Sequence, residues 1–324
     1  MRPVRASLLC LVMAGAAAPH GSPLTASGPP GARDPGTTAS TPPGARPLPF
    51  FYDLYTFRGR EGGTAVVAAF AVSAGKLERE AVEGAVRYRF DVTLVLADTA
   101  RRTVFRTDDS VFVRVPRPLA GAHLLYTHIE VLAPPSATTQ QRVIMTDATT
   151  PGIGQLYKGH FPIPDYSGSG LLLSDLALGQ PGARAGWRRG DVTLALLPTG
   201  EFPGTSFELF YEVYNLPPGN PYTTEITIEP TDDARAPAPG DGTGVRLHFT
   251  GVSTARPDGV LQELRHVDAS VDRGRHRITV TVTDDATGET ASRSRILHVR
   301  SWHSGATMVA AMPWARRPER DGPR

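Results

Sequence analysis

The chain has almost no cysteine: Cys10 is the only one among 324 residues. It lies within residues 1–20, which have the layout of a secretory signal peptide, with Arg2 and Arg5 before an uncharged run from Ala6 to Ala18. Removal of this segment leaves a chain without cysteine, which excludes disulfides, thiol catalysis and thiolate metal sites. We therefore predict an exported protein, periplasmic or extracellular.

The apolar run is too short for a spanning helix, which needs about 20 apolar residues. Cys10 lies inside this run and follows Leu9, whereas a lipid-acceptor cysteine stands at the end of the run after a small residue. We expect no transmembrane span in the mature chain.

Lysine is also scarce, with Lys76 and Lys158 as the only two. The 34 basic residues, mostly arginine, face 32 acidic ones, so the formal net charge is +2. Such a balance creates no long-range field toward nucleic acid or an anionic membrane. Nucleic acid is therefore not an expected partner.

Motifs that assemble catalytic or cofactor sites are missing from the sequence. Ser167–Gly170 has the composition of a nucleophile elbow with the wrong spacing, and Gly152–Gly154 lacks the third glycine of a dinucleotide loop. His123 and His128 are five apart, so on one strand they face opposite sides and do not chelate. We predict no catalytic residue, no cofactor and no metal ligand, and we expect that the protein is not an enzyme.

Acidic turns raise the question of calcium, because extracellular sandwiches often hold this ion between loops. The segments 232–233, 241 and 284–289 lack the spaced carboxylates and glycine of a dedicated calcium loop. Turn-forming aspartate is the favoured interpretation.

Period-two alternation dominates the rest of the chain. Between Val86 and Leu96, six apolar residues alternate with arginine, aspartate, threonine and valine, which predicts a strand with Val86, Tyr88, Phe90, Val92, Leu94 and Leu96 toward a core. Leu77–Gly84 is the one helix-like patch, and we expect a surface turn of helix there. Further strands are predicted at 64–70, 111–115, 124–132, 142–146, 191–197, 207–216, 222–228, 245–249, 276–283 and 292–299, the last two forming a hairpin.

These elements predict an all-β fold of two tandem antiparallel immunoglobulin-like β-sandwich domains, at 50–165 and 170–300. A cluster of proline, glycine and serine places the boundary between Pro162 and Leu171. Residues 21–49, rich in glycine, proline, serine and threonine, are predicted to be a disordered linker. Residues 301–324 are predicted to form an irregular tail.

Two groups of residues are candidates for contact with a protein partner. In the predicted strand 207–216, Phe207, Leu209, Tyr211 and Val213 should line the core, which leaves Phe210 and Tyr214 on the other face. If that face is open, they form an apolar contact patch. The tail is expected to dock on a partner or on a sandwich, through Trp302, Met308, Met312 and Trp314.

The chain resembles the C-terminal β-sandwich region of bacterial GWxTD-domain proteins, an exported family. The likeness rests on the strings Phe51–Tyr55, Leu173–Leu176 and Phe210–Leu216 and on the closing hairpin. The defining motif is not present, because Gly186–Trp187 is followed by Arg-Arg-Gly-Asp. The resemblance implies the exported compartment and the sandwich architecture, and no functional residue is carried over.

The leading hypothesis is a non-catalytic extracytoplasmic interaction or scaffold protein, such as an extrinsic subunit of a larger envelope complex. The alternative is a glycan-binding module, which needs a row of exposed aromatic side chains. Whether Tyr52, Tyr55, Tyr211, Tyr214 and Trp187 are exposed separates these two. An unrecognised hydrolase is the third hypothesis.

Overall fold

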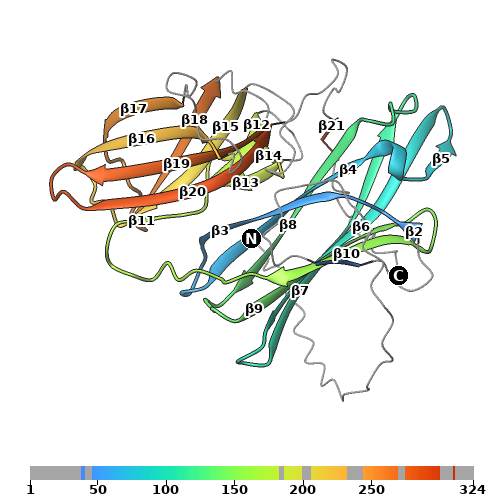
Figure 1. The fold of residues 1–324 in the computed structure, drawn as a ribbon, viewed down its shortest axis with the longest axis horizontal. Helices are drawn as coiled ribbons and strands as arrows, with labels where there is room; N and C mark the ends of the chain where they lie inside the picture. Colours follow the sequence, from blue (N-terminus) through green and yellow to red (C-terminus); the bar gives the residue numbers. More distant parts are fainter. Residues whose placement is uncertain are drawn as a thin grey trace, which may run out of the picture.

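The computed structural model describes residues 38–40, 46–181, 186–198, 206–231, 244–268 and 274–299, and the backbone of 309–310. These residues are all-β, as predicted, and form two antiparallel β-sandwiches that lie side by side (Figure 1). No helix in this part of the chain has the length and apolar character needed to cross a membrane.

The first sandwich has a seven-stranded sheet and a four-stranded sheet. The larger sheet holds β1 (Thr38–Ser40), β2 (Arg46–Pro47), β5 (Arg79–Val82), β6 (Ala85–Asp98), β7 (Thr103–Val115), β9 (Thr139–Asp147) and β10 (Ile153–His160). The smaller one has the order β21-β8-β4-β3, from β3 (Phe51–Arg58), β4 (Thr64–Ser73), β8 (Leu124–Ala133) and β21 (Val309–Ala310). A short 3-10 turn, Ala74–Lys76, follows β4.

The second sandwich has a six-stranded and a four-stranded sheet. The larger holds β11 (Leu172–Leu173), β12 (Ala177–Pro181), β13 (Trp187–Arg189), β14 (Val192–Leu196), β15 (Ser206–Tyr214) and β18 (Val260–Asp268). The smaller holds β16 (Pro221–Pro230), β17 (Val245–Val252), β19 (Gly274–Asp284) and β20 (Thr290–Val299). Between β10 and β11 the chain passes from one sandwich to the other, and no described strand pairs across the two.

The predicted register of β6 is confirmed. Five of its six apolar residues are fully buried in the first core, and Val86 is half-buried against it. The hairpin of β19 and β20 is confirmed as well: the Gly288 amide donates to the Asp284 carbonyl in the turn, and Gly288 has a φ of 77°. That positive φ suits glycine.

The helix predicted at Leu77–Gly84 is wrong, since this segment contains strand β5. Val82 pairs with Ala85, so only Glu83 and Gly84 form the turn, and Gly84 has a φ of 63°. Two-residue hairpin turns need positive φ, which glycine supplies. Pairing with the long strand β6 therefore overrides the helix-forming composition of this segment.

The predicted linker 21–49 also contains more structure than expected. β1 pairs antiparallel with β10, β2 pairs parallel with it, and Leu48 is completely buried. Pairing with an open strand edge needs only backbone groups, so a segment poor in apolar residues can still form a strand. The ordered chain thus begins before residue 50, while 1–37 and 41–45 lie outside the described residues.

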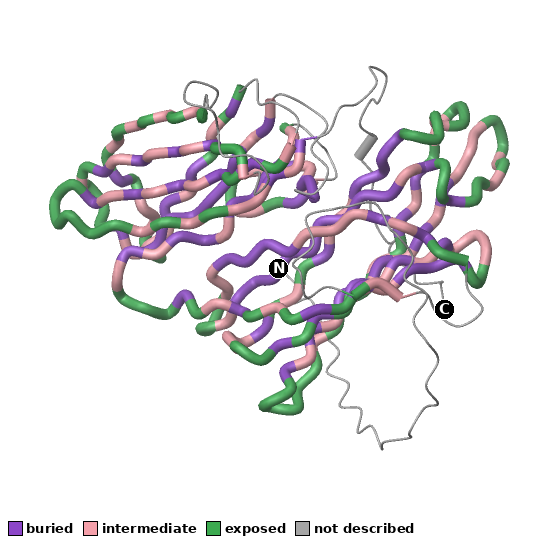
Figure 2. Tube along the Cα trace, in the orientation of Figure 1, coloured by how far each residue is buried: buried purple, intermediate pink, exposed green. Residues whose placement is uncertain are grey.

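Two strands are buried on both of their faces. β4 alternates between the core of its own sandwich, through Val66, Ala68 and Phe70, and a cluster that it shares with the second sandwich, through Val67 and Ala69. β15 does the same from the other side. Both strands are therefore covered on each face, and the buried strands concentrate in the middle of the molecule (Figure 2).

Candidate functional site

The two sandwiches meet at an interface, called the joint from here on, which contains an apolar cluster. Its aromatic centre is Phe57 of β3, Trp187 of β13 and Phe210 of β15, whose ring centres lie 5.0 to 5.8 Å apart. All three are buried. Aromatic pairs at these separations contribute about 1 kcal/mol each beyond the area they bury. Phe210 is therefore part of the joint and is not exposed to a partner.

Strand β3 is the outermost strand of its sheet, so the peptide groups along one edge have no neighbouring strand among the described residues. Thr56 donates its amide to Asp175 Oδ2 at 2.9 Å and accepts from the Asp175 amide at 3.0 Å. Arg295 Nη2 donates to the Leu54 carbonyl at 2.9 Å. At the end of the strand, the Arg58 amide donates to the Tyr214 hydroxyl at 2.7 Å. The second sandwich thus covers this strand edge, which would otherwise be open to pairing with another chain.

A four-residue ion network lies beside this edge. Arg295 Nη1 is 2.7 Å from Asp53 Oδ2, and Arg293 Nε donates to Asp175 Oδ1 at 2.8 Å. Burial by itself lowers the pKa of Arg295, but the charges of Asp53 and Asp175 outweigh burial and raise it above its usual range. Arg295 stays protonated, and its charge is matched across the two sandwiches.

A second network surrounds Glu212 on β15. Arg189 donates from Nε and Nη2 to the two carboxylate oxygens, at 2.8 and 2.7 Å, which is the strong bidentate arrangement. Gln262 and the Tyr214 hydroxyl also donate to Glu212, at 2.9 and 2.7 Å. Burial, and then the charge of Glu212, raise the pKa of Tyr214 above its usual range, so Tyr214 stays protonated. Arg189 Nη2 also donates to the Arg58 carbonyl, and this hydrogen bond connects the network to β3.

The predicted contact patch is therefore not exposed. Phe210 and Tyr214 do lie on the face opposite the core residues of β15, as predicted, but the first sandwich covers that face. Trp302, Met308, Met312 and Trp314 lie outside the described residues. Between them, Val309 and Ala310 pair with Leu125 and Tyr126 of β8 through the backbone.

Sequence reasoning missed the charged residues of the joint. Arg293 and Arg295 share one face of β20 with Ala291, Leu297 and Val299, which all contact the second core. Arginines on an otherwise apolar strand face are a signal that this face meets a charged partner. Asp53 and Asp175 carry no such signal, because short acidic residues also occur in turns.

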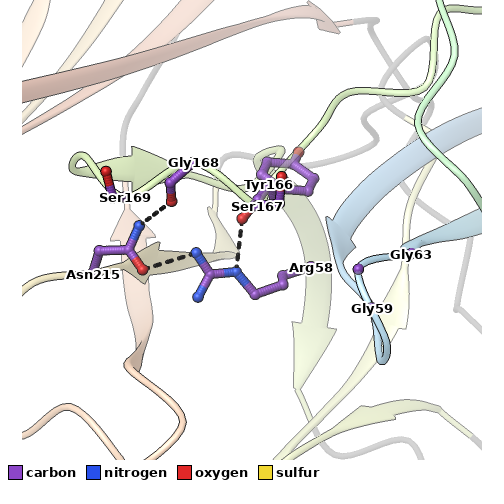
Figure 3. A pocket seen from close by; sticks show the side chains of 9 residues that line it. Arg58, Gly59, Gly63, Tyr166, Ser167, Gly168, Ser169 and Asn215 are labelled. Carbon is purple, nitrogen blue, oxygen red and sulfur yellow. Dashed lines mark hydrogen bonds between the residues drawn. The ribbon is translucent and has the colours of Figure 1, made fainter.

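A hollow of about 380 Å³ opens at one end of the joint. It lies between the β3–β4 turn, the segment 166–169 and Asn215 (Figure 3). Arg58 lines it, with Nε donating to the Tyr166 carbonyl and Nη2 to Asn215 Oδ1, both at 3.0 Å. Asn215 in turn donates to the carbonyls of Gly168 and Gly170 at 2.7 Å. Three residues of Ser167–Gly170, the segment with the composition of a nucleophile elbow, line this hollow: Ser167, Gly168 and Ser169.

The histidines and acidic turns give no metal site among the described residues. His123 is buried just before β8, and His128 lies within that strand; desolvation lowers the pKa of His128 to about 4. Asp284 accepts from the Ala286 amide and from Asn220, as a turn aspartate does. Positions 232–233 and 241 lie outside the described residues.

No protein-family model matches the chain, and no curated protein matches it. A red sea bream transglutaminase is 11% identical over 78% of this chain and 31% of its own, with a TM-score of 0.22. A calcium-binding mutant of β-glucuronidase 2 from Bacteroides uniformis is 8% identical over 81% of this chain and 32% of its own, with a TM-score of 0.23. The chain spans about a third of each. Similarity at this level assigns neither a family nor an activity.

Proposed function

We propose that the protein is a non-catalytic interaction or scaffold protein of the cell envelope, in which the two sandwiches act as one rigid body. The observation that carries the proposal is the joint: the peptide groups of Leu54, Thr56 and Arg58 are bonded largely by the second sandwich. Domain contacts within a chain are ordinarily small and mobile. A joint with an aromatic centre, one buried ion network and one partly buried ion network favours a fixed spacing between binding surfaces.

The compartment rests on the sequence. The N-terminal segment has the layout of a signal peptide, and the chain without it has no cysteine. The resemblance to GWxTD-domain proteins points to the same compartment. Long loops on a rigid sandwich are where recognition residues usually lie, which suits a protein partner.

The glycan-binding alternative loses the feature that motivated it. Tyr55, Tyr211, Tyr214 and Trp187 are fully buried, and Tyr52 is half-buried between Phe50 and Tyr157. These side chains cannot stack on a sugar in a row. The binding proposal therefore rests on a protein partner.

The test is affinity capture from the native envelope with the mature chain and with an Asp175→Ala, Arg295→Met variant as bait. Small-angle scattering checks whether the variant loses the fixed arrangement of the two sandwiches, and circular dichroism checks that its strands persist. We expect a partner that the mature chain enriches and the variant does not. Equal enrichment by a variant whose sandwiches have come apart would contradict the rigid-scaffold proposal, and so would the absence of any specific partner.

A further inference from the structure

Strand β17 is the last strand of its sheet and has one open edge. It pairs with β16 along its whole length, from Val245 to Val252, and no described strand pairs with its other edge. Figure 1 shows β17 at the outer margin of the second sandwich, on the side of its sheet away from β20. Unpaired peptide groups along a strand edge can form hydrogen bonds with another extended chain.

The other long strands that end a sheet are protected against such pairing. The second sandwich covers the edge of β3. The other three strands have charged side chains on the face that carries their buried apolar residues: Asp109 on β7, Glu263 and Arg265 on β18, and Arg293 and Arg295 on β20. Charges on the inner face of an edge strand disfavour pairing, because an added strand would bury them further.

Strand β17 has none of these protective features. It contains no proline, and its register with β16 runs without a bulge. Its inner face consists of Val245, Leu247, Phe249 and Gly251, with no charge among them. The three larger side chains are only half-buried against the second core. An added strand with apolar residues on the same face would remove more of their surface from water, which favours binding.

The outer face of β17 determines which charge suits the added strand. Arg246 and His248 are its titratable residues, both exposed, and β17 has no acidic residue. Glu225 on β16 contacts Arg246 at 3.7 Å, but the two side chains are 41% and 69% exposed, so this pair is weak. Opposite charges on directly opposed residues of neighbouring strands are favourable, and like charges are unfavourable. Acidic residues opposite Arg246 and His248 would therefore favour binding.

We propose that β17 binds an extended segment of a protein partner as an additional strand of the sheet, with acidic residues on the outer face alternating with apolar residues on the inner face. Main-chain hydrogen bonds supply the affinity in this mode of recognition, and the alternating side chains supply the selectivity. The inference rests on the proposed interaction function, for which it names the surface and the chemistry of the partner. A second copy of the chain fits less well, because self-pairing of β17 brings only basic residues to the outer face.

The test uses two synthetic peptides as long as β17 and blocked at both ends. In one, glutamate alternates with valine, and in the other, lysine replaces glutamate. Fluorescence anisotropy should show that the mature chain binds the glutamate peptide about fivefold or more tightly than the lysine peptide, because glutamate attracts Arg246 and lysine repels it. Amide hydrogen exchange should show increased protection at 245–252 when the glutamate peptide is bound.

Three variants assign the binding to this edge. Arg246→Glu, His248→Glu changes two exposed residues and should reverse the preference, so that the lysine peptide binds more tightly. Arg106→Glu is the matched control, because Arg106 is similarly exposed on the protected edge strand β7, and it should keep the preference for glutamate. Leu247→Lys adds an inner-face charge like those of the other edges, so neither peptide should bind. Circular dichroism checks that each variant keeps its strands.

Sedimentation of the mature chain alone tests self-pairing. A dimer that Leu247→Lys abolishes would overturn the proposal in favour of a second copy. Failure of the glutamate peptide to bind, equal affinity for the two peptides, or an unchanged preference in Arg246→Glu, His248→Glu would also overturn it. None of these results depends on the capture of a partner from the envelope, which remains the separate test of the interaction function.

Discussion

Asp175 and Thr56 are 119 positions apart, yet three hydrogen bonds join them across the two sandwiches. Asp175 Oδ2 accepts from the Thr56 amide at 2.9 Å and from its hydroxyl at 2.7 Å, and the Asp175 amide donates to the Thr56 carbonyl. The other carboxylate oxygen accepts from Arg293. Asp175 thus takes the place of a neighbouring strand for Thr56 and neutralises an arginine of the second sandwich.

Replacement of Asp175 by alanine should destabilise the protein by about 3 kcal/mol, because it leaves a partly buried arginine and a strand edge without partners. Asp175→Asn keeps an acceptor oxygen and should cost less. Urea unfolding measures both. Asp108→Ala removes an exposed pair with Arg106, both side chains being 64% exposed, and should change stability by less than about 0.5 kcal/mol. Equal effects of Asp175→Ala and Asp108→Ala would show that Asp175 contributes no more stability than an exposed aspartate.

Phe210→Ser should destabilise the protein by about 3 to 5 kcal/mol, since it removes a buried aromatic ring from the joint and introduces a hydroxyl. Tyr214→Phe keeps the ring but leaves the Arg58 amide and one bond of Glu212 unsatisfied, at a cost of about 1 to 3 kcal/mol. Thermal unfolding measures both, with Val252→Ser, at a 61% exposed position, as the control. A double Phe210→Ser, Tyr214→Ser variant that melts like the unmodified protein would mean that this face is open in solution.

The free energy of unfolding should decrease in mild acid because of His128. Desolvation lowers its pKa from 6.5 to about 4, so the unfolded chain binds the proton more readily than the folded chain. Its contribution is fully present above pH 6.5 and is lost as the pH falls toward 4, by about 1.4 kcal/mol for each unit of difference between the two pKa values. Unfolding between pH 7 and 4 should show a shallower pH dependence for His128→Asn than for the unmodified protein, and His248→Asn, at an exposed position on β17, should change nothing. Identical pH profiles for all three proteins would contradict the desolvated, neutral state of His128.

The backbone of Gly75 passes close to the backbone of Gly121 next to β4. A Cβ on Gly75 would lie 2.9 Å from the Gly121 Cα, whereas a Cβ on Gly121 would lie 3.8 Å from the Gly75 Cα. Because the obstacle is backbone, Gly75→Ala should cost about 1 to 3 kcal/mol, and Gly121→Ala should be tolerated. Chemical denaturation of the two variants measures the difference, and a Gly75→Ala variant as stable as Gly121→Ala would contradict the geometry.

The sequence predicted most of the strands because the alternation that identifies a strand is local. The alternation from Val86 to Leu96 indicates by itself which side chains face the core, and the composition of Asp284–Gly288 indicates a turn. It failed at Leu77–Gly84, where the composition favours helix and only pairing with β6 makes a strand. The sequence pattern also did not predict β10 and β18, which have polar and charged residues on one face or at their ends.

The candidate site depends on the tertiary structure for a different reason. Alternation shows that a strand has two faces, but it does not show whether the second face meets water or another sheet. For Phe210 and Tyr214 the sequence determined that they share the face opposite the core, and only the docking of the two sandwiches decided that this face is buried. The partners of Arg295 and Arg58 were decided in the same way. Their contacts join residues more than 100 positions apart, and no local pattern records such pairings.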